Sequence, residues 1–154
     1  MNFRYRGLPS EPFAGLFDLT DPECAARGMR RVVADEKPGF PCRVTLEDAE
    51  PGEALLLLPF EHQPAHSPYR AAGPIFIRAG QHATYDATQS PPVLLGRLLS
   101  VRAYDDDGMM IEADVAEGCA IEPLLERLFA HADTSYVHLH YARRGCFACR
   151  VERA

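Results

Sequence analysis

One stretch near the end of the chain organises the rest, Tyr136-Val-His-Leu-His-Tyr-Ala-Arg-Arg-Gly-Cys-Phe-Ala-Cys-Arg-Val151. Its first six residues alternate between two faces, as in a half-buried strand. Gly145 then offers the positive φ that a short hairpin loop needs. The stretch therefore predicts a β-hairpin.

The register of this hairpin stays open at the level of the sequence. A loop of three residues pairs Tyr141 with Phe147 and Leu139 with Cys149. A loop of two residues instead sets His138 opposite Cys149. A shift of one residue changes which side chains share a face, so the register decides whether histidines and cysteines meet.

The two histidines of the hairpin are candidate metal ligands. In His138-Leu-His140 both imidazoles point to the same side of a strand, about 6.5–7 Å apart by the strand rise. Such a pair can chelate zinc or another divalent metal if a third ligand comes from elsewhere in the chain. The alternative is that both are ordinary residues of a sheet face.

The pair Cys146-Phe-Ala-Cys149 has three interpretations. A redox pair normally sits at the start of a helix, and only five residues follow Cys149. A zinc knuckle needs a second pair with this spacing, which the chain lacks. The third interpretation is two semi-buried thiols that fill space in the fold.

Composition sets limits on the class of protein. The chain has 154 residues, five cysteines and a net charge of -6, and its basic residues do not cluster. These features predict a single globular domain over 1–154 with reduced thiols in the cytoplasm, and they disfavour nucleic acid as a partner. With neither a long apolar run nor a secretory signal, no membrane association is expected.

The remaining elements follow from periodicity and turn residues. Short helices are expected over 10–19 and after Thr20, which forms a capping box with Glu23. Strands are expected over 29–34, 42–46, 54–60 and 74–78, and a hairpin from 98–104 and 109–115 around an Asp-rich turn. Apolar residues from Ile121 to Ala130 recur at helical spacing. We predict an α+β fold in which a mostly antiparallel curved sheet or partial barrel is packed by this amphipathic helix, with two short N-terminal helices.

A candidate pocket is predicted around the segment 61–73, which follows the most apolar strand. Thirteen residues with two prolines and no clear period form an unusually long connection, and long anchored loops are often functional. The residues proposed to line the pocket are Cys42, Arg43, Glu61, His62, His66, Tyr69, Arg70 and Cys146. The alternative is a surface connection stiffened by proline.

Four motifs, in order along the chain, resemble those of a bacterial domain-of-unknown-function family, number 1203 in that series. They are Pro41–Gly52, Ser67–Phe76, Arg102-Ala-Tyr-Asp and His140–Cys146. This resemblance brings no known activity and no catalytic residue.

Two main functions remain open, with a thiol redox protein as a third. The first is a small-ligand-binding or enzyme-like domain with a His/Cys/Arg-lined pocket, in which a metal on His138 and His140 would activate water. The second is a non-enzymatic interaction or regulatory module. The sequence supports a small molecule as partner more than nucleic acid, and it leaves the oligomeric state undetermined.

Overall fold

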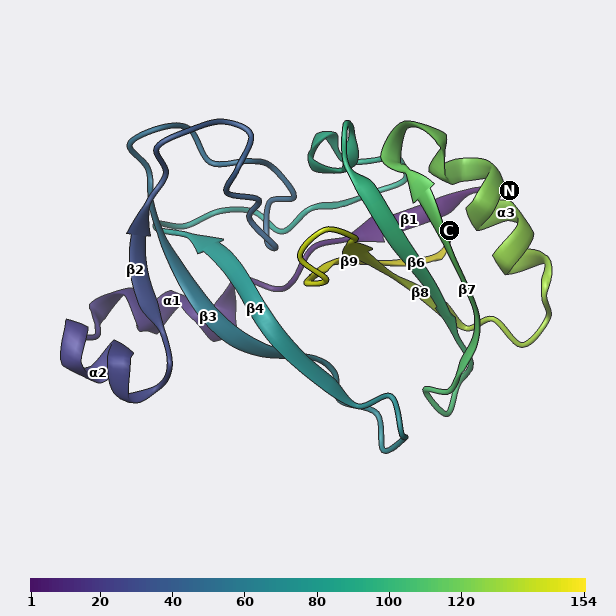
Figure 1. The fold of residues 1–154 in the computed structure, drawn as a ribbon, viewed down its shortest axis with the longest axis horizontal. Coiled ribbons are helices and arrows are strands. Elements are labelled where there is room, and N and C mark those ends of the chain that lie inside the picture. Colours follow the sequence, from purple (N-terminus) through teal and green to yellow (C-terminus); the bar gives the residue numbers. More distant parts are fainter.

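Two antiparallel sheets face each other in the computed structural model, which describes all residues 1–154. The large sheet has six strands in the order β5-β1-β9-β8-β6-β7, and the small sheet has the order β2-β3-β4. Figure 1 shows that the sheets are separate layers that do not close into a barrel. The predicted α+β fold of mostly antiparallel strands with one longer helix is confirmed, and the strands form two open sheets.

The bounds of the large-sheet strands are β1 Phe3–Arg6, β5 Asp86–Ala87, β6 Leu98–Tyr104, β7 Met110–Glu117, β8 Tyr136–Tyr141 and β9 Phe147–Arg153. The small sheet contains β2 Arg30–Val33, β3 Ala54–Gln63 and β4 Ala71–Arg78. The α-helices are α1 Glu11–Ala14, α2 Asp21–Ala26 and α3 Ile121–Ala130, and short 3-10 helices cover Gly15–Asp18, Pro92–Leu94 and Gly118–Ala120.

Helix α3 covers the outer face of the large sheet (Figure 1), as its periodicity predicts. Its buried residues are Ile121, Leu125, Leu128 and Phe129. They join one apolar cluster with inward residues of β6, β8 and β9. Arg127, on the exposed side of the helix, pairs with Glu112 at 2.9 Å and with Asp114 on β7.

The N-terminal helices lie beside the small sheet and share a second apolar cluster with it. The capping box at the start of α2 is confirmed, because the Glu23 backbone N–H donates to Thr20 Oγ1 and the Thr20 N–H donates to the Glu23 carboxylate at 2.7 Å. This cap satisfies two backbone donors that the start of a helix otherwise leaves free.

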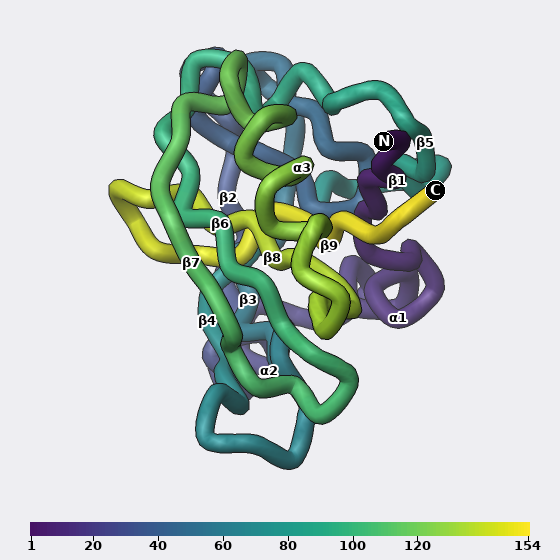
Figure 2. The backbone as a smooth tube through the Cα atoms, turned by 90° about the vertical axis from the view of Figure 1, so that its right-hand side faces the viewer, coloured from purple at the N-terminus to yellow at the C-terminus, as the bar shows by residue number.

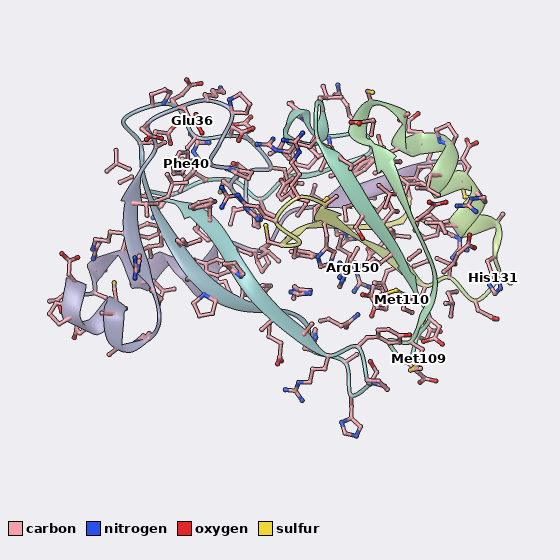
Figure 3. All side chains as sticks on the ribbon, in the orientation of Figure 1. Glu36, Phe40, Met109, Met110, His131 and Arg150 are labelled. Atoms are coloured by element: carbon pink, nitrogen blue, oxygen red, sulfur yellow. The ribbon has the colours of Figure 1, made fainter.

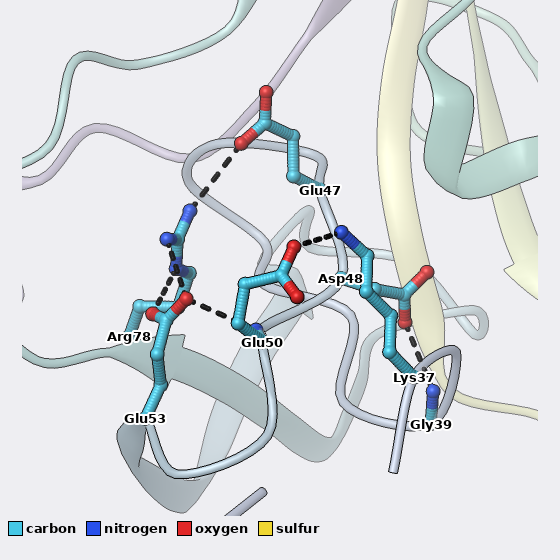
Figure 4. Close-up of polar contacts among 7 residues, drawn as sticks. All are labelled: Lys37, Gly39, Glu47, Asp48, Glu50, Glu53 and Arg78. Atoms are coloured by element: carbon cyan, nitrogen blue, oxygen red, sulfur yellow. Dashed lines mark hydrogen bonds and ion pairs between the residues drawn. The ribbon is translucent and has the colours of Figure 1, made fainter.

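The expected strand over 42–46 is wrong. Cys42 makes only an isolated bridge to Phe76, and Leu46 turns back on it with a φ of 51°. The surrounding segment 35–53 has little regular structure, and charged side chains hold it in place (Figure 4). Arg78 on β4 reaches Glu53 at 2.7 Å, and Lys37 pairs with Glu50. The turn at Leu46 buries the Leu46 side chain in the core. An extended strand would not place this side chain in the core.

The long connection predicted over 61–73 is also shorter than expected, because β3 continues to Gln63 and β4 begins at Ala71. The register shifts between Phe60 and Gln63, which interrupts the alternation of the strand. The pairing of Gln63 with Ala71 was therefore not predictable from the sequence pattern. The tip at 64–70 reaches the β6–β7 turn, where Ser67 Oγ donates to the Gly108 carbonyl at 2.9 Å. Figure 2 shows both turns at the same end of the molecule.

The terminal hairpin follows the predicted three-residue register in part and also contains a bulge. Leu139 pairs with Cys149, as a three-residue loop predicts, but the register then shifts, so that His140 pairs with Phe147. Ala148 is the extra residue, and Gly145 has the expected positive φ of 78°. The bulge places Phe147 and Arg150 on the same face as the histidines, although simple alternation would separate them.

Candidate functional site

Three histidines from the two sheets meet where the sheets face each other. His138 and His140 project from β8, and His62 reaches them from the end of β3. The ring centroid of His62 is 4.9 Å from that of His140 and 6.2 Å from that of His138, and the two hairpin rings are 6.3 Å apart. We call these residues the histidine cluster.

Aromatic rings fix the orientation of the cluster. Phe147 lies parallel to the ring of His62, with centroids 5.5 Å apart, and meets His138 edge-on at 5.1 Å. Tyr104 and Tyr136 each lie 5.1 Å from His138 on its other side. These contacts hold the imidazoles by packing, so their positions do not depend on hydrogen bonds alone.

Hydrogen bonding leaves ring nitrogens of the cluster unused. Nδ1 of His140 lies 3.0 Å from the Gly145 carbonyl, which only accepts, so Nδ1 carries the proton and Nε2 of the neutral ring is free to accept. Nε2 of His140 and Nδ1 of His62 and His138 are buried without a partner. Buried polar atoms are almost always bonded in native proteins, so three such atoms in one cluster need an explanation.

Burial keeps these imidazoles uncharged. It lowers the pKa of His138 to about 2, with the neighbouring His140 as the second cause. It also lowers the pKa of His140 to about 4, against the raising effect of the hydrogen bond to Gly145. The pKa of His62 is lowered as well, by burial and by the positive charge of Arg102. All three rings are therefore neutral near pH 7 and offer lone pairs.

A pocket of about 570 Å³ opens beside the cluster. Its wall combines Phe60 and His62 from the small sheet with His138, Phe147 and Arg150 from the large sheet. The Arg150 side chain lies near the centre of the molecule (Figure 3). This volume is in the range of small-molecule sites, which combine apolar walls with a few placed polar groups.

Two residues proposed from the sequence, Arg43 and Cys146, meet at the hairpin loop. The Arg43 side chain is only 1% exposed and donates to the Phe147 carbonyl at 2.7 Å, to the Pro41 carbonyl at 2.5 Å and to Cys146 Sγ at 3.1 Å. Its guanidinium also lies over the Tyr141 ring. Arg43 therefore holds the hairpin against the 41–43 segment, and it does not line the pocket beside the histidine cluster.

The other proposed pocket residues take different places. Cys42 is buried in the apolar cluster of the small sheet. Glu61 lines the pocket but pairs with Arg70 at 3.1 Å, and His66 is exposed at the hairpin tip. Tyr69 is 37% exposed and approaches Tyr104 edge-on. Of this set, His62 is the residue that joins the histidines of the hairpin.

Alternation along 136–141 already placed Tyr136 on the face of the two histidines, but the sequence reasoning missed Arg102, Tyr104 and Arg150 as neighbours of the cluster. Arg102 on β6 and Arg150 on β9 stand directly opposite His138 on its two sides. Alternation along 98–104 places Arg102 and Tyr104 on one face of the strand. This pattern was the sequence signal that could have identified them together. The pairing of β6 with β8 and the bulge in β9 were not readable from the sequence.

The two thiols of the hairpin lie in different surroundings. All five cysteines are free, and Cys149 lies in the core under α3, where burial raises the pKa of its thiol to about 12. Cys146 is partly buried, packs against the edge of this core and accepts a hydrogen bond from Arg43. Of the three interpretations of this pair, the one that describes Cys149 best is a buried thiol that fills space in the fold.

No group of three or more His, Cys, Asp or Glu side chains is arranged to hold a metal ion. The metal site on His138 and His140 stays a prediction, because the third ligand that it needs is not supplied at such a geometry. None of the helices combines the length and the apolar character that crossing a membrane requires.

Comparisons with known proteins identify the family. The model of the family described as "Protein of unknown function (DUF1203)" matches residues 39–153, which include His62, His138 and His140. No curated protein and no solved structure matches the chain. Since the family model covers most of the sequence, the chain belongs to the DUF1203 family.

Proposed function

We propose that this chain is a bacterial cytoplasmic protein that binds a small polar molecule in the pocket between the two sheets. The observation that carries the proposal is the histidine cluster beside this pocket, which holds three buried ring nitrogens without partners. A ligand that donates hydrogen bonds, directly or through water, would satisfy them.

The neutral imidazoles favour hydrogen bonding over proton transfer. A general base works best with a pKa near the operating pH, whereas burial holds the pKa of His138 at about 2 and that of His140 at about 4. The enzyme-like version of the proposal is therefore the metal-assisted one, in which the metal would activate water. Binding is the part of the proposal that the geometry supports directly, because His62 and His138 line the pocket.

A thermal-shift screen of small polar molecules tests the proposal. Compounds that raise the melting temperature of the wild-type protein should lose their effect in His138→Leu, which removes an imidazole from the pocket wall. His66→Leu, at the exposed hairpin tip, is the matched control and should respond like the wild type. If hits stabilise His138→Leu as well as the wild type, the pocket is not their site and the proposal fails.

Elemental analysis of the purified protein distinguishes the metal-assisted version. Zinc near one equivalent, lost in the double variant His138→Ala/His140→Ala, would make the cluster a metal centre. Without such a metal, the screen alone decides between a ligand-binding domain and an interaction module.

A further inference from the structure

Three arginines and one histidine stand in a row across four adjacent strands of the large sheet. Arg102 on β6 is opposite His138 on β8, His138 is opposite Arg150 on β9, and Arg150 is opposite Arg6 on β1. Side chains at directly opposite positions lie on the same face of a sheet, with Cβ atoms about 4.5–5.5 Å apart. We call Arg102, His138, Arg150 and Arg6 the cationic row, in which the three arginines carry the charge and His138 is neutral.

This row has an excess of positive charge. Like charges directly opposite each other destabilise a sheet. Glu152 offsets part of the repulsion, because its carboxylate contacts Arg6 at 3.1 Å and Arg150 at 2.7 Å. Arg102 instead bonds to Ser100 Oγ at 3.1 Å and has no carboxylate within ion-pair distance. Glu152 thus serves two of the three guanidinium groups and leaves Arg102 without a carboxylate partner.

Two other carboxylates line the pocket wall. Glu61 pairs with Arg70, which lies outside the row. Asp86 pairs with Arg4 and also stands opposite Arg6, so it offsets part of the charge at that end of the row. No ion pair joins either carboxylate to Arg102 or Arg150. The polar face of the large sheet therefore keeps a local positive charge in a protein whose net charge is -6.

The row is accessible from the pocket. Arg6, His138 and Arg150 all line the 570 Å³ pocket. The Arg150 guanidinium lies 3.9 Å from the centroid of the Tyr136 ring, which holds it in one orientation. A guanidinium with a fixed orientation presents parallel N–H donors that match the two oxygens of a carboxylate or phosphate group.

We propose that the pocket binds a small oxyanion, a carboxylate or phosphate compound, on the cationic row. This inference rests on the proposed function, since it names the class of ligand for the same pocket. The bound anion supplies the negative charge that the row lacks. A hydrogen-bond donor elsewhere on the ligand, or a bridging water, satisfies the accepting ring nitrogens of the histidine cluster.

Calorimetric titration of the full chain at constant ionic strength tests the inference with three probes. Succinate is the carboxylate probe, succinamide is its uncharged counterpart, and inorganic phosphate distinguishes the two sources of an oxyanion. The variants are Arg150→Gln and Arg102→Gln, and Arg144→Gln is the control because it makes the same charge change at an exposed site in the hairpin loop.

Succinate or phosphate should bind the wild-type protein, and succinamide should not. Loss of a charged hydrogen-bond donor in Arg150→Gln should weaken binding by about tenfold or more. Arg102→Gln should weaken it less, because Arg102 stands at the end of the row, and Arg144→Gln should bind as the wild type does. Should Arg150→Gln fail to fold, Arg6→Gln, which also removes a guanidinium from the pocket wall, decides the test.

Two results overturn the oxyanion inference. One is the absence of binding by both anions, and the other is an equal loss of affinity in Arg144→Gln and Arg102→Gln. If the anions fail while uncharged compounds from the thermal-shift screen still depend on His138, the proposed function stands and only the ligand class is wrong. If no compound depends on His138, both proposals fail.

Discussion

The two faces of the large sheet are built by the same strands and differ in almost every physical respect. On the face under α3, Val101, Leu139 and Val151 are fully buried among apolar neighbours. On the opposite face, one residue along each strand, stand Arg102, His138 and Arg150. The first face contributes to stability by apolar packing, whereas the second combines partly exposed arginines with a buried imidazole whose Nδ1 has no hydrogen-bond partner.

This difference separates stability from function. An apolar face gains free energy from the removal of surface from water. A face with buried polar atoms that lack partners loses free energy, unless a ligand or water satisfies them. Such an arrangement on one side of a well-packed sheet is typical of a binding site, where stability is given up for preorganisation.

The largest effect is expected on the apolar face. Leu139→Ala removes a fully buried side chain that packs under α3 and should lower the free energy of unfolding by about 2–5 kcal/mol. Urea denaturation measures the loss. Val115→Ala, on the exposed part of β7, is the control and should change little. A small effect of Leu139→Ala would mean that this face is not the main core.

Acidification should lower the free energy of unfolding through the histidines of the polar face. The folded-state pKa values of His138 and His140 are about 2 and about 4, below the value of about 6.5 for a free histidine. The unfolded chain therefore takes up protons first as the pH falls below 6.5, and stability falls with it. For each of the two histidines, the free energy of unfolding should fall by about 2 kcal/mol between pH 7 and pH 5.

Unfolding free energies at pH 7 and pH 5 measure this loss, and His138→Leu should reduce the difference between them by about 2 kcal/mol. The range stops at pH 5 because carboxylates with lowered pKa values, such as those of Glu53 and Asp86, contribute below it. An unchanged pH dependence in His138→Leu would show that this imidazole is not held neutral by burial.

A smaller effect is expected from His140→Leu at pH 7. This change removes the hydrogen bond from Nδ1 to the Gly145 carbonyl and should lower the free energy of unfolding by about 1 kcal/mol. Because Gly145 is exposed, water can replace the lost donor. A loss above about 3 kcal/mol, seen in the same urea titration, would assign His140 a structural role in the hairpin.

Much of this architecture was predictable from the sequence, because periodicity and turn chemistry are local. Helix α3 runs from Ile121 to Ala130 as predicted, and the capping box at Thr20 and the turn at Gly145 follow the same local rules. The two histidines on one face of β8 also follow from alternation. These features need no knowledge of which strands pair.

The site itself depends on pairings between distant residues. His62 joins His138 only because the small sheet faces the large one, and Arg102 stands beside His138 only because β6 pairs with β8. The bulge at Ala148 moves Phe147 opposite His140 on the polar face, whereas the three-residue loop would pair Phe147 with Tyr141. Strand order and bulges reflect the packing of the whole chain, so local patterns do not reveal them.

The most direct test of the central claim, that the polar face is kept for binding, is the free energy of unfolding of His138→Leu at pH 7. Nδ1 of His138 has no hydrogen-bond partner and the ring packs among Tyr104, Tyr136 and Phe147, so an apolar side chain of similar size should fit. The account predicts a value equal to that of the wild type or higher by up to about 1 kcal/mol. A loss of more than about 2 kcal/mol would contradict it and make His138 a structural residue.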